Sequence, residues 1–267
     1  MSKSDAERAG AAVVLRRAAP VATVLINRPQ ANNAIDRHVR AGLLRAAGEI
    51  AADRSIRVVV LASTSGDSFS SGLDISEIAV LSPQEADALA REARQVYEAF
   101  AALEVPVVAA IRGACIGAGL ELALHCDIRF ARIDARFALP GVGVGLVPGG
   151  GALARLSRIV GAGPARAFAL TGAAISAERA FMLGLVANVA QADEFDDVLG
   201  GLVGHLASLS PVAMRELKML LAAAENGEIG AAADLGPAAL ARCFAEGDAG
   251  ERLRTLFRGL DPEATLH

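Results

Sequence analysis

Two small-residue turns, each following an apolar stretch, hold the residues of this 267-residue chain best suited to chemistry. The stretch Val107–Ile111 predicts a buried strand, which leads through the glycine-rich segment Gly113–Gly119 into a short helical pattern. Glycine at such a junction lets the backbone approach a ligand closely, and the first turn of a helix leaves N–H groups unpaired. Glu121 stands at the opening of this helix. Unpaired N–H groups beside a carboxylate suit reactions in which a carbonyl oxygen becomes an oxyanion while a proton moves nearby.

A second turn of the same kind, Asp67–Asp74, reads DSFSSGLD and follows the apolar stretch Val58–Leu61. Together the two turns resemble motifs of the enoyl-CoA hydratase/isomerase (crotonase) superfamily. Its members carry F-x-x-G-x-D-[LI] and, further along, P-[VI]-[VI]-A-A-[VI]-x-G-x-x-x-G-[GA]-G-x-E-L-[AT]. The chain has FSSGLDI from Phe69 and PVVAAIRGACIGAGLEL from Pro106.

Two further segments extend this resemblance. The segment Ile26–Ala34 (INRPQANNA) is similar to the family's L-N-R-P-x-x-x-N-A motif. The segment Pro140–Gly150 (PGVGVGLVPGG) is similar to the family's P-E-x-x-x-G-x-x-P-x-x-G block. Because four motifs occur in the family's order, the resemblance is far more specific than any single motif.

The resemblance implies roles for three positions. The backbone N–H groups of Leu73 and Ala118 would form an oxyanion hole for a thioester carbonyl, and Glu121 would match the glutamate that activates water in hydratases. Taken alone, the two turns are equally consistent with tight connections between elements. Taken alone, Glu121 would be better explained as a carboxylate that stabilises a helix start, worth about 0.3–1 kcal/mol.

The family's second glutamate is missing. The P-E dipeptide is Pro140-Gly141 in this chain, and no acidic residue occurs from Ala135 to Ala177. In hydratases this glutamate resembles the proton donor to the α-carbon, and losing a positioned acid typically costs about 10²–10⁴-fold in rate. Three interpretations stay open: Glu121 handles both protons, an acid arrives from elsewhere, or hydration is not the reaction. The alternatives to a hydratase are an isomerase without hydratase activity and a non-catalytic acyl-CoA-binding protein.

Further positions are expected to contact the acyl-CoA substrate because they lie in the matching motifs. These positions are Arg28, Gln30, Asn32, Ser71, Asp74, Ile75, Gly117, Pro140 and Gly141. Arg28 and the backbone around Gln30–Asn32 would hold the nucleotide of coenzyme A. Asp74 is expected to brace its loop more than to touch substrate.

Other side chains with possible chemistry have simpler interpretations. The acids after the second turn, including Glu77 and Glu92, are expected on a solvated helix face, and Tyr97 is expected in the core. His125 and Cys126 are adjacent on a helix, so their side chains do not face each other as a nucleophile and base would.

Composition narrows the class of protein. With 26 basic and 30 acidic residues the net charge is −4, which argues against a nucleic-acid partner. Three cysteines without metal-ligand spacing predict no metal site and a reducing compartment. The N-terminus lacks a signal-peptide pattern, and the uncharged stretch Phe137–Ala154 is too rich in glycine for a membrane span. We therefore expect a cytoplasmic protein with no membrane partner and no cofactor beyond the coenzyme A of its substrate.

Apolar stretches alternate with amphipathic helical patterns, which predicts an α/β fold. Strands are expected at 12–15, 21–26, 58–61, 107–111, 127–131 and 136–139, and long helices at 36–52 and 82–103. The resemblance implies a crotonase-like spiral of ββα units over residues 1–200, which holds the acyl-CoA site. Residues 201–267 would form a C-terminal helical trimerisation region of the same module. With 53% hydrophobic residues and a mean hydropathy of +0.41, the alanine-rich helices need a covering surface, and we expect a homotrimer or hexamer.

Overall fold

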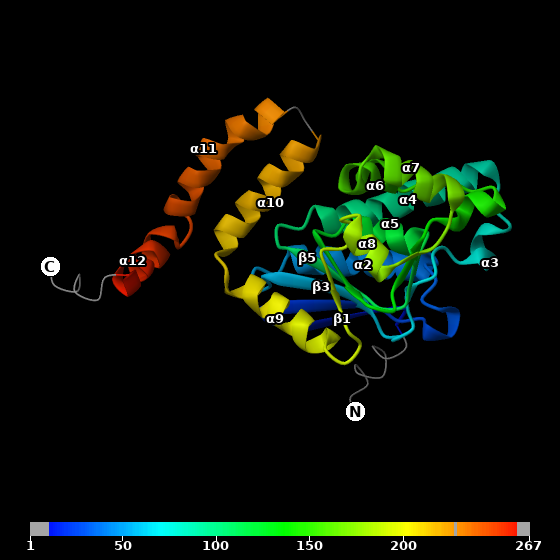
Figure 1. Cartoon of the computed structure of the whole chain (residues 1–267), viewed down its shortest axis with the longest axis horizontal. Coiled ribbons are helices and arrows are strands. Elements are labelled where there is room, and N and C mark those ends of the chain that lie inside the picture. Colours follow the sequence, from blue (N-terminus) through cyan, green and yellow to red (C-terminus); the bar gives the residue numbers. More distant parts are fainter. Residues whose placement is uncertain (1–10, 227–228, 261–267) are drawn as a thin grey trace. The chain divides into compact units, whose positions relative to one another are not determined.

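The computed structural model describes residues 11–226 and 229–260, and the chain divides into two compact units, residues 1–204 and 205–267. The first unit contains two β-sheets with helices packed on them, and the second is helical (Figure 1). The predicted α/β class and helical C-terminal region are therefore confirmed.

The larger sheet has six strands in the order β1-β2-β3-β5-β7-β10. Its strands are β1 (Val13–Ala18), β2 (Val21–Ile26), β3 (Val58–Ser63), β5 (Val107–Ile111), β7 (Ile128–Arg132) and β10 (Asn188–Ala190). The hairpin β1–β2 is antiparallel, and every other pair in this sheet is parallel. Val59 and Leu61 join the main hydrophobic core, whereas Val60 and Ala62 point to the other face because side chains alternate along a strand.

The smaller sheet has the order β4-β6-β8-β9. Its strands are β4 (Ser68–Ser70), β6 (Ala114–Ile116), β8 (Arg136–Ala138) and β9 (Ile175–Ser176). Two of these strands lie inside the segments that the sequence predicts as turns. The parallel pairing of β4 with β6 brings these two segments side by side.

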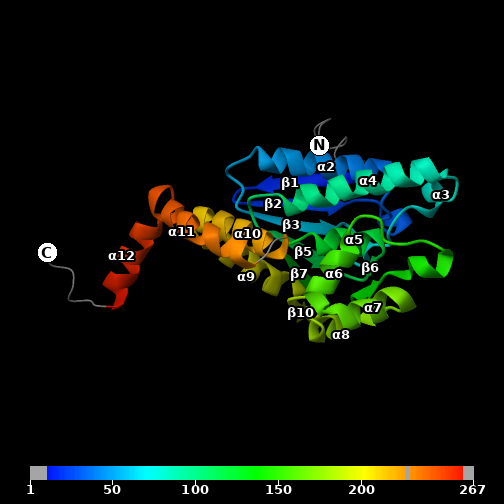
Figure 2. The same ribbon diagram turned by 90° about the horizontal axis from the view of Figure 1, so that it is seen from above.

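Two amphipathic helices, α2 (Arg37–Ala51) and α4 (Pro83–Ala101), lie side by side along one face of the larger sheet (Figure 2). Asp36 begins α2 by accepting a hydrogen bond from the Val39 N–H at 2.8 Å. Ser82 and Glu85 form a capping box at the start of α4. Both helices fall within two residues of their predicted bounds.

The remaining helices of the first unit are short, except for the one that runs across the boundary between the units. They are α3 (Ile75–Ile78), α5 (Ala118–Leu124), α6 (Ala152–Val160), α7 (Ala162–Thr171), α8 (Ala177–Met182) and α9 (Phe195–Ser208), with the 3-10 turns η1 (Pro29–Ala31) and η2 (Pro140–Val144). Every residue of α5 is buried. The helix that carries Glu121 is therefore part of the core and cannot shift without disturbing the packing around it.

The second unit consists of α10 (Pro211–Asn226), α11 (Ile229–Ala245) and α12 (Ala249–Leu260). Glu216 of α10 accepts a hydrogen bond from Arg242 of α11 at 2.7 Å, which ties these two helices together. No single described helix is long and apolar enough to cross a membrane. The bent pair α9 and α10 passes that test by length and composition only.

Candidate active site

The two glycine turns meet backbone to backbone. Gly72 has a φ of +101°, and a Cβ built on it would lie 3.1 Å from the Ile116 carbonyl oxygen and 3.5 Å from the Ala118 nitrogen. A side chain at Gly72 would therefore be strained and would push the two turns apart. This close approach places the backbone of Leu73 next to the start of α5.

The backbone of Leu73 is oriented by a short parallel bridge to Ile35. The Ile35 N–H donates to the Gly72 carbonyl at 2.7 Å, and the Asp74 N–H donates to the Ile35 carbonyl at 3.3 Å. Because successive peptide groups of an extended chain point in opposite directions, the Leu73 N–H is directed away from Ile35.

Ala118 is the first residue of α5, where an N–H has no acceptor within the helix. The preceding Gly117 has a φ of +52°, and its own N–H donates to the Ala138 carbonyl at 2.9 Å. Within the described residues, neither the Leu73 nor the Ala118 N–H has a hydrogen-bond acceptor. Two donors without an acceptor in the described residues thus lie on segments whose backbones are in contact, and an oxyanion hole is built from such donors.

Glu121 lies one helical turn beyond Ala118, and it is only 6% exposed. Its Oε2 accepts a hydrogen bond from the Gly150 N–H at 2.9 Å. Burial raises the pKa of Glu121 to about 7, and the Gly150 hydrogen bond opposes this rise. A carboxyl group with a pKa near neutrality can both accept and release a proton, which is the property of a general acid–base catalyst.

The buried Tyr97 ring borders this carboxylate, and a second buried ring, His125, packs against Tyr97. A Cβ built on Gly150 would lie 2.4 Å from Tyr97 Cε2 and 2.9 Å from Glu121 Oε2, so only glycine fits between them. The His125 ring lies 5.4 Å from the Tyr97 ring, and its Nδ1 donates to the Glu121 backbone carbonyl at 2.7 Å. Burial lowers the pKa of His125 to about 4, so the ring is neutral at pH 7. Tyr97 packs in the core, as predicted from the sequence, and its ring also borders Glu121.

The position of the missing second glutamate follows β8, a strand of the smaller sheet that pairs with β6. Ala138 of β8 pairs with Ile116 of β6, and the turn η2 begins two residues later. Gly141 lies in this turn, where its carbonyl accepts a hydrogen bond from the Leu146 N–H at 2.8 Å. Gly141 therefore follows closely after β8, the strand that pairs with β6 of the glycine-rich segment Gly113–Gly119. We call this segment and Asp67–Asp74 the oxyanion turns. Gly141 has no side chain to direct towards them.

Arg28 and Asp74 are engaged with each other. Arg28 Nη1 donates to Asp74 Oδ2 and to the Ala34 carbonyl, both at 2.9 Å, and lies 3.3 Å from Asp36 Oδ2. Asp74 also caps α3 by accepting from the Ser76 N–H. The Ser76 hydroxyl and, after it, Arg28 hold the pKa of Asp74 below its usual value. Both side chains thus fix the turn that carries Leu73, and their contact with substrate stays a prediction.

The other predicted contact residues lie on nearby loops. Gln30, Asn32, Ser71, Ile75 and Pro140 are exposed. The Ser71 N–H donates to the Asn32 carbonyl at 3.0 Å, which joins the first loop to the oxyanion turn. The exposed side chains in these two loops are accessible to a ligand.

One buried residue was missed by the sequence analysis, and one acid is less exposed than expected. Arg40, on the face of α2 that also carries the buried Val39, is bonded to Glu77 and Glu92. The predicted solvated face holds for Glu92, whose side chain is 43% exposed, but less well for Glu77, which is 25% exposed and bonds to this guanidinium through both carboxylate oxygens. The available signal was the place of Arg40 on the buried face of α2, where an arginine needs a partner.

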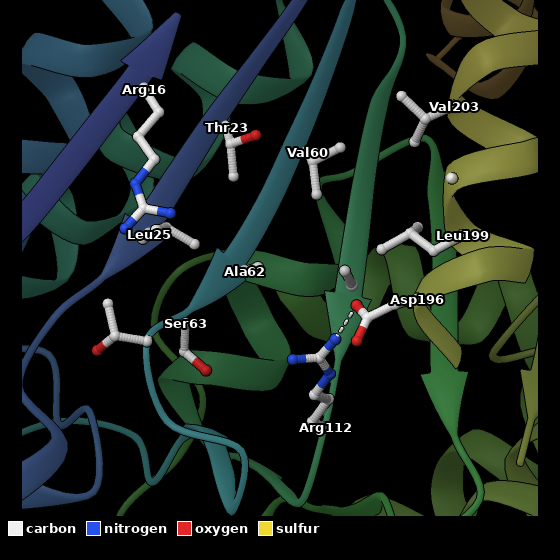
Figure 3. Close-up of a pocket in the computed structure, with 13 residues that line it drawn as sticks. Arg16, Thr23, Leu25, Val60, Ala62, Ser63, Arg112, Asp196, Leu199 and Val203 are labelled. Carbon is white, nitrogen blue, oxygen red and sulfur yellow. Dashed lines mark hydrogen bonds and ion pairs between the residues drawn. The ribbon is translucent and has the colours of Figure 1, made fainter. Parts of the chain in front are cut away.

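A cavity of about 460 Å³ lies on the face of the larger sheet turned away from the core (Figure 3). Figure 3 shows Leu199 and Val203 of α9 directed towards the strands, and Arg112 paired with Asp196. Arg112 also lies 4.7 Å above the centre of the Phe195 ring. None of the contact residues expected from the sequence lines this cavity, so it is separate from the oxyanion turns.

The oxyanion turns and Glu121 together can bind a carbonyl oxygen and move a proton beside it. Across residues 11–226 and 229–260, no group of three or more His, Cys, Asp or Glu residues is placed to hold a metal ion. The described site therefore presents backbone donors and one carboxyl group of near-neutral pKa.

Comparisons with known proteins show which sequences and structures the chain is similar to. The family model described as enoyl-CoA hydratase/isomerase matches residues 16–242. A short-chain-enoyl-CoA hydratase of Clostridium acetobutylicum is 34% identical over 236 residues, covering 88% of this chain and 90% of that protein. A crystal structure of an enoyl-CoA hydratase from Bacillus anthracis has a TM-score of 0.89 and 26% identity, covering 93% of this chain and 96% of that one. A putative enoyl-CoA hydratase from Thermobifida fusca, solved in complex with CoA, has a TM-score of 0.82 and 28% identity, covering 90% of this chain and 96% of that one.

Proposed function

Since this chain belongs to the enoyl-CoA hydratase/isomerase family, we propose that its acyl-CoA substrate binds with the thioester oxygen between the Leu73 and Ala118 N–H groups. The observation that carries this proposal is the meeting of these two unpaired donors one helical turn from the buried Glu121. Charge develops on a thioester oxygen when an enolate forms, and fixed donors stabilise that charge without reorganising.

In hydration, Glu121 takes a proton from water as the water oxygen bonds to the β-carbon of the enoyl group. The electron pair of the carbon–carbon double bond moves towards the thioester oxygen, where the Leu73 and Ala118 N–H groups stabilise the enolate. The enolate then collapses, and Glu121 returns its proton to the α-carbon. One carboxyl group suffices for this balance because its pKa is about 7.

Isomerisation is the second candidate reaction, and Gly141 is the observation that favours it. A single carboxylate can take a proton from one carbon and return it to another, which moves the double bond through a dienolate whose thioester oxygen lies at the same two donors. Incubation with crotonyl-CoA, with longer enoyl-CoAs and with double-bond isomers decides between the two reactions. Hydration of a 2-enoyl-CoA supports the first, and shift of the double bond alone supports the second. Tight binding without turnover of any thioester would identify a non-catalytic binder and overturn both.

Restoring the missing acid by Gly141→Glu is expected to raise the hydration kcat by about 10²-fold, the lower end of what a positioned acid contributes. Gly141 has no positive φ, so a side chain is allowed there. A Cβ would lie 3.0 Å from the Leu146 carbonyl oxygen, so the turn must yield by a few tenths of an ångström. Gly141→Gln is the matched control, because it brings the same crowding without an acid. Equal rates for both variants would show that the second acid is not limiting.

We also propose that the protein assembles as a homotrimer, or as a hexamer of two trimers. The second unit leaves large apolar side chains exposed, among them Leu221 on α10 at 64% and Leu240 on α11 at 63%. Another subunit would cover such side chains. Size exclusion with light scattering at micromolar concentration is expected to give three or six times the 27.3 kDa chain mass. A persistent monomer would refute the assembly.

The proposed reactions require no cofactor other than the coenzyme A of the substrate. A cytoplasmic location is also proposed, since it would keep the thiols of Cys115, Cys126 and Cys243 reduced, as the structure has them.

A further inference from the structure

The strongest buried polar cluster outside Glu121 is centred on Arg40, whose side chain is 3% exposed. Its Nη1 and Nη2 donate to the two carboxylate oxygens of Glu77 at 3.1 and 2.7 Å. Its Nε donates to Glu92 Oε2 at 2.9 Å. Arg40 belongs to α2, Glu77 to α3 and Glu92 to α4, so one guanidinium joins three helices.

A buried arginine needs a specific reason, because removing its charge from water is costly. Burial lowers the pKa of Arg40, but the bonds to Glu77 and Glu92 outweigh this, so its pKa lies above the usual value. Apolar residues of similar volume would fill such a site without the desolvation cost. Apolar residues would not, however, form directed hydrogen bonds to two other helices, as Arg40 does to α3 and α4.

The two carboxylate partners differ in what else holds their helices. The helix α4 is anchored to the core by Val96 and Phe100, which are at most 1% exposed. The helix α3 has four residues and none of them is buried. Because so short a helix is not stable alone, α3 depends on its polar contacts. These are Asp74 at its start and the Glu77–Arg40 pair within it.

The helix α3 directly follows the oxyanion turn, since Leu73 precedes its capping residue Asp74. The orientation of α3 therefore contributes, together with the Ile35 bridge and the Arg28–Asp74 pair, to the direction of the peptide that carries the Leu73 N–H. We propose that Arg40 is a positioning residue of this site: by holding Glu77, it fixes α3 and so aims the Leu73 donor at the thioester oxygen. This inference rests on the proposed role of Leu73 in binding that oxygen.

The pair of variants Glu77→Gln and Glu92→Gln tests the inference. Each removes one carboxylate charge from the same guanidinium, and Glu77→Gln should lower the melting temperature more, because Glu77 accepts two hydrogen bonds from Arg40 and Glu92 accepts one. Glu77→Gln should lower kcat about 10-fold or more, since complete loss of one oxyanion donor costs about 10²–10³-fold. Glu92→Gln should leave kcat within about twofold, because α4 keeps its core anchors. Glu77→Asp keeps the negative charge on a side chain one methylene shorter, and it should lower kcat by less than Glu77→Gln does. It is the variant to measure if Glu77→Gln does not fold.

A binding measurement separates this inference from the proposed function. A 3-ketoacyl-CoA forms an enolate whose ultraviolet absorbance reports how well the oxyanion hole binds it. The wild-type protein and Glu92→Gln should stabilise the enolate equally, and Glu77→Gln should stabilise it at least about tenfold less. No enolate signal and no acyl-CoA turnover from the wild type would overturn the proposed function itself. A normal wild-type signal with equal behaviour of Glu77→Gln and Glu92→Gln would overturn the role of Arg40 alone.

Discussion

Replacing Glu121 with glutamine is expected to lower kcat for enoyl-CoA turnover by about 10²–10⁴-fold, because the amide cannot accept the proton that the reaction transfers. Glutamine has the size of glutamate, and its carbonyl can still accept the Gly150 N–H. The loss should therefore come from chemistry and leave the fold intact. Steady-state rates of both proteins with the same enoyl-CoA measure it.

The pH profile sharpens this test. A base with a pKa of about 7 is ionised above that pH, so wild-type kcat/KM should rise with pH through about 7 and then level off. The residual kcat/KM of Glu121→Gln should not show this rise with pH. The raised pKa also predicts stability that is fully present below pH 4.5 and is lost as pH rises through about 7. The melting temperature of the variant should show no such loss.

A matched control is Glu98→Gln, which makes the same substitution on the exposed face of α4. Glu98 pairs there with Arg94, and its side chain is 51% exposed. Its kcat and pH profile should equal those of the wild type. Wild-type activity in Glu121→Gln would rule out Glu121 as the base.

Replacing Ala118 with proline is expected to lower kcat/KM by about 10²–10³-fold, the usual cost of one lost oxyanion donor. Proline lacks an N–H, and the first position of a helix tolerates it because that N–H has no partner within the helix. Ala118 occupies this position in α5. The substitution thus removes a donor while the helix can persist.

Ala118→Gly is the control for this variant, since it changes the side chain and keeps the N–H. Its kcat/KM should stay within about tenfold of wild type, because glycine costs roughly 1 kcal/mol of helix stability but no donor. Calorimetric titration with an inert acyl-CoA and circular dichroism should accompany the rates. Equal kcat/KM and equal affinity in Ala118→Pro and the wild type would remove Ala118 from the oxyanion hole.

The parts of the fold that sequence could predict were those with strong periodicity. The helices α2 and α4 have clear apolar faces and caps, and β5 is a continuous apolar run. The strands β4 and β6 were missed because three residues among glycines and serines show no alternation. Their pairing is nevertheless what joins the two turns of the site.

The predictable part of the site was similarly limited to local patterns. Glu121 and the two turns could be identified because their spacing is contained within short motifs. The contacts of Glu121 with Gly150 and Arg40 with Glu77 join residues far apart in the chain. A pattern of residue types along the chain does not encode such distances: the buried face of α2 could have marked Arg40 but not its partners, and Glu77 was assigned to solvent.

The strength of the hydrogen bond from the Gly150 N–H to Glu121 depends on whether Glu121 is protonated. A neutral carboxyl group accepts a weaker hydrogen bond than a carboxylate does. In the proposed reaction, protonation of Glu121 would therefore weaken its hydrogen bond with the Gly150 N–H, and α6 begins only two residues later. By thermodynamic linkage, anything that displaces this loop also changes the proton affinity of Glu121. In the proposed reaction, the segment before α6 would therefore be held more strongly while Glu121 is ionised than while it is protonated.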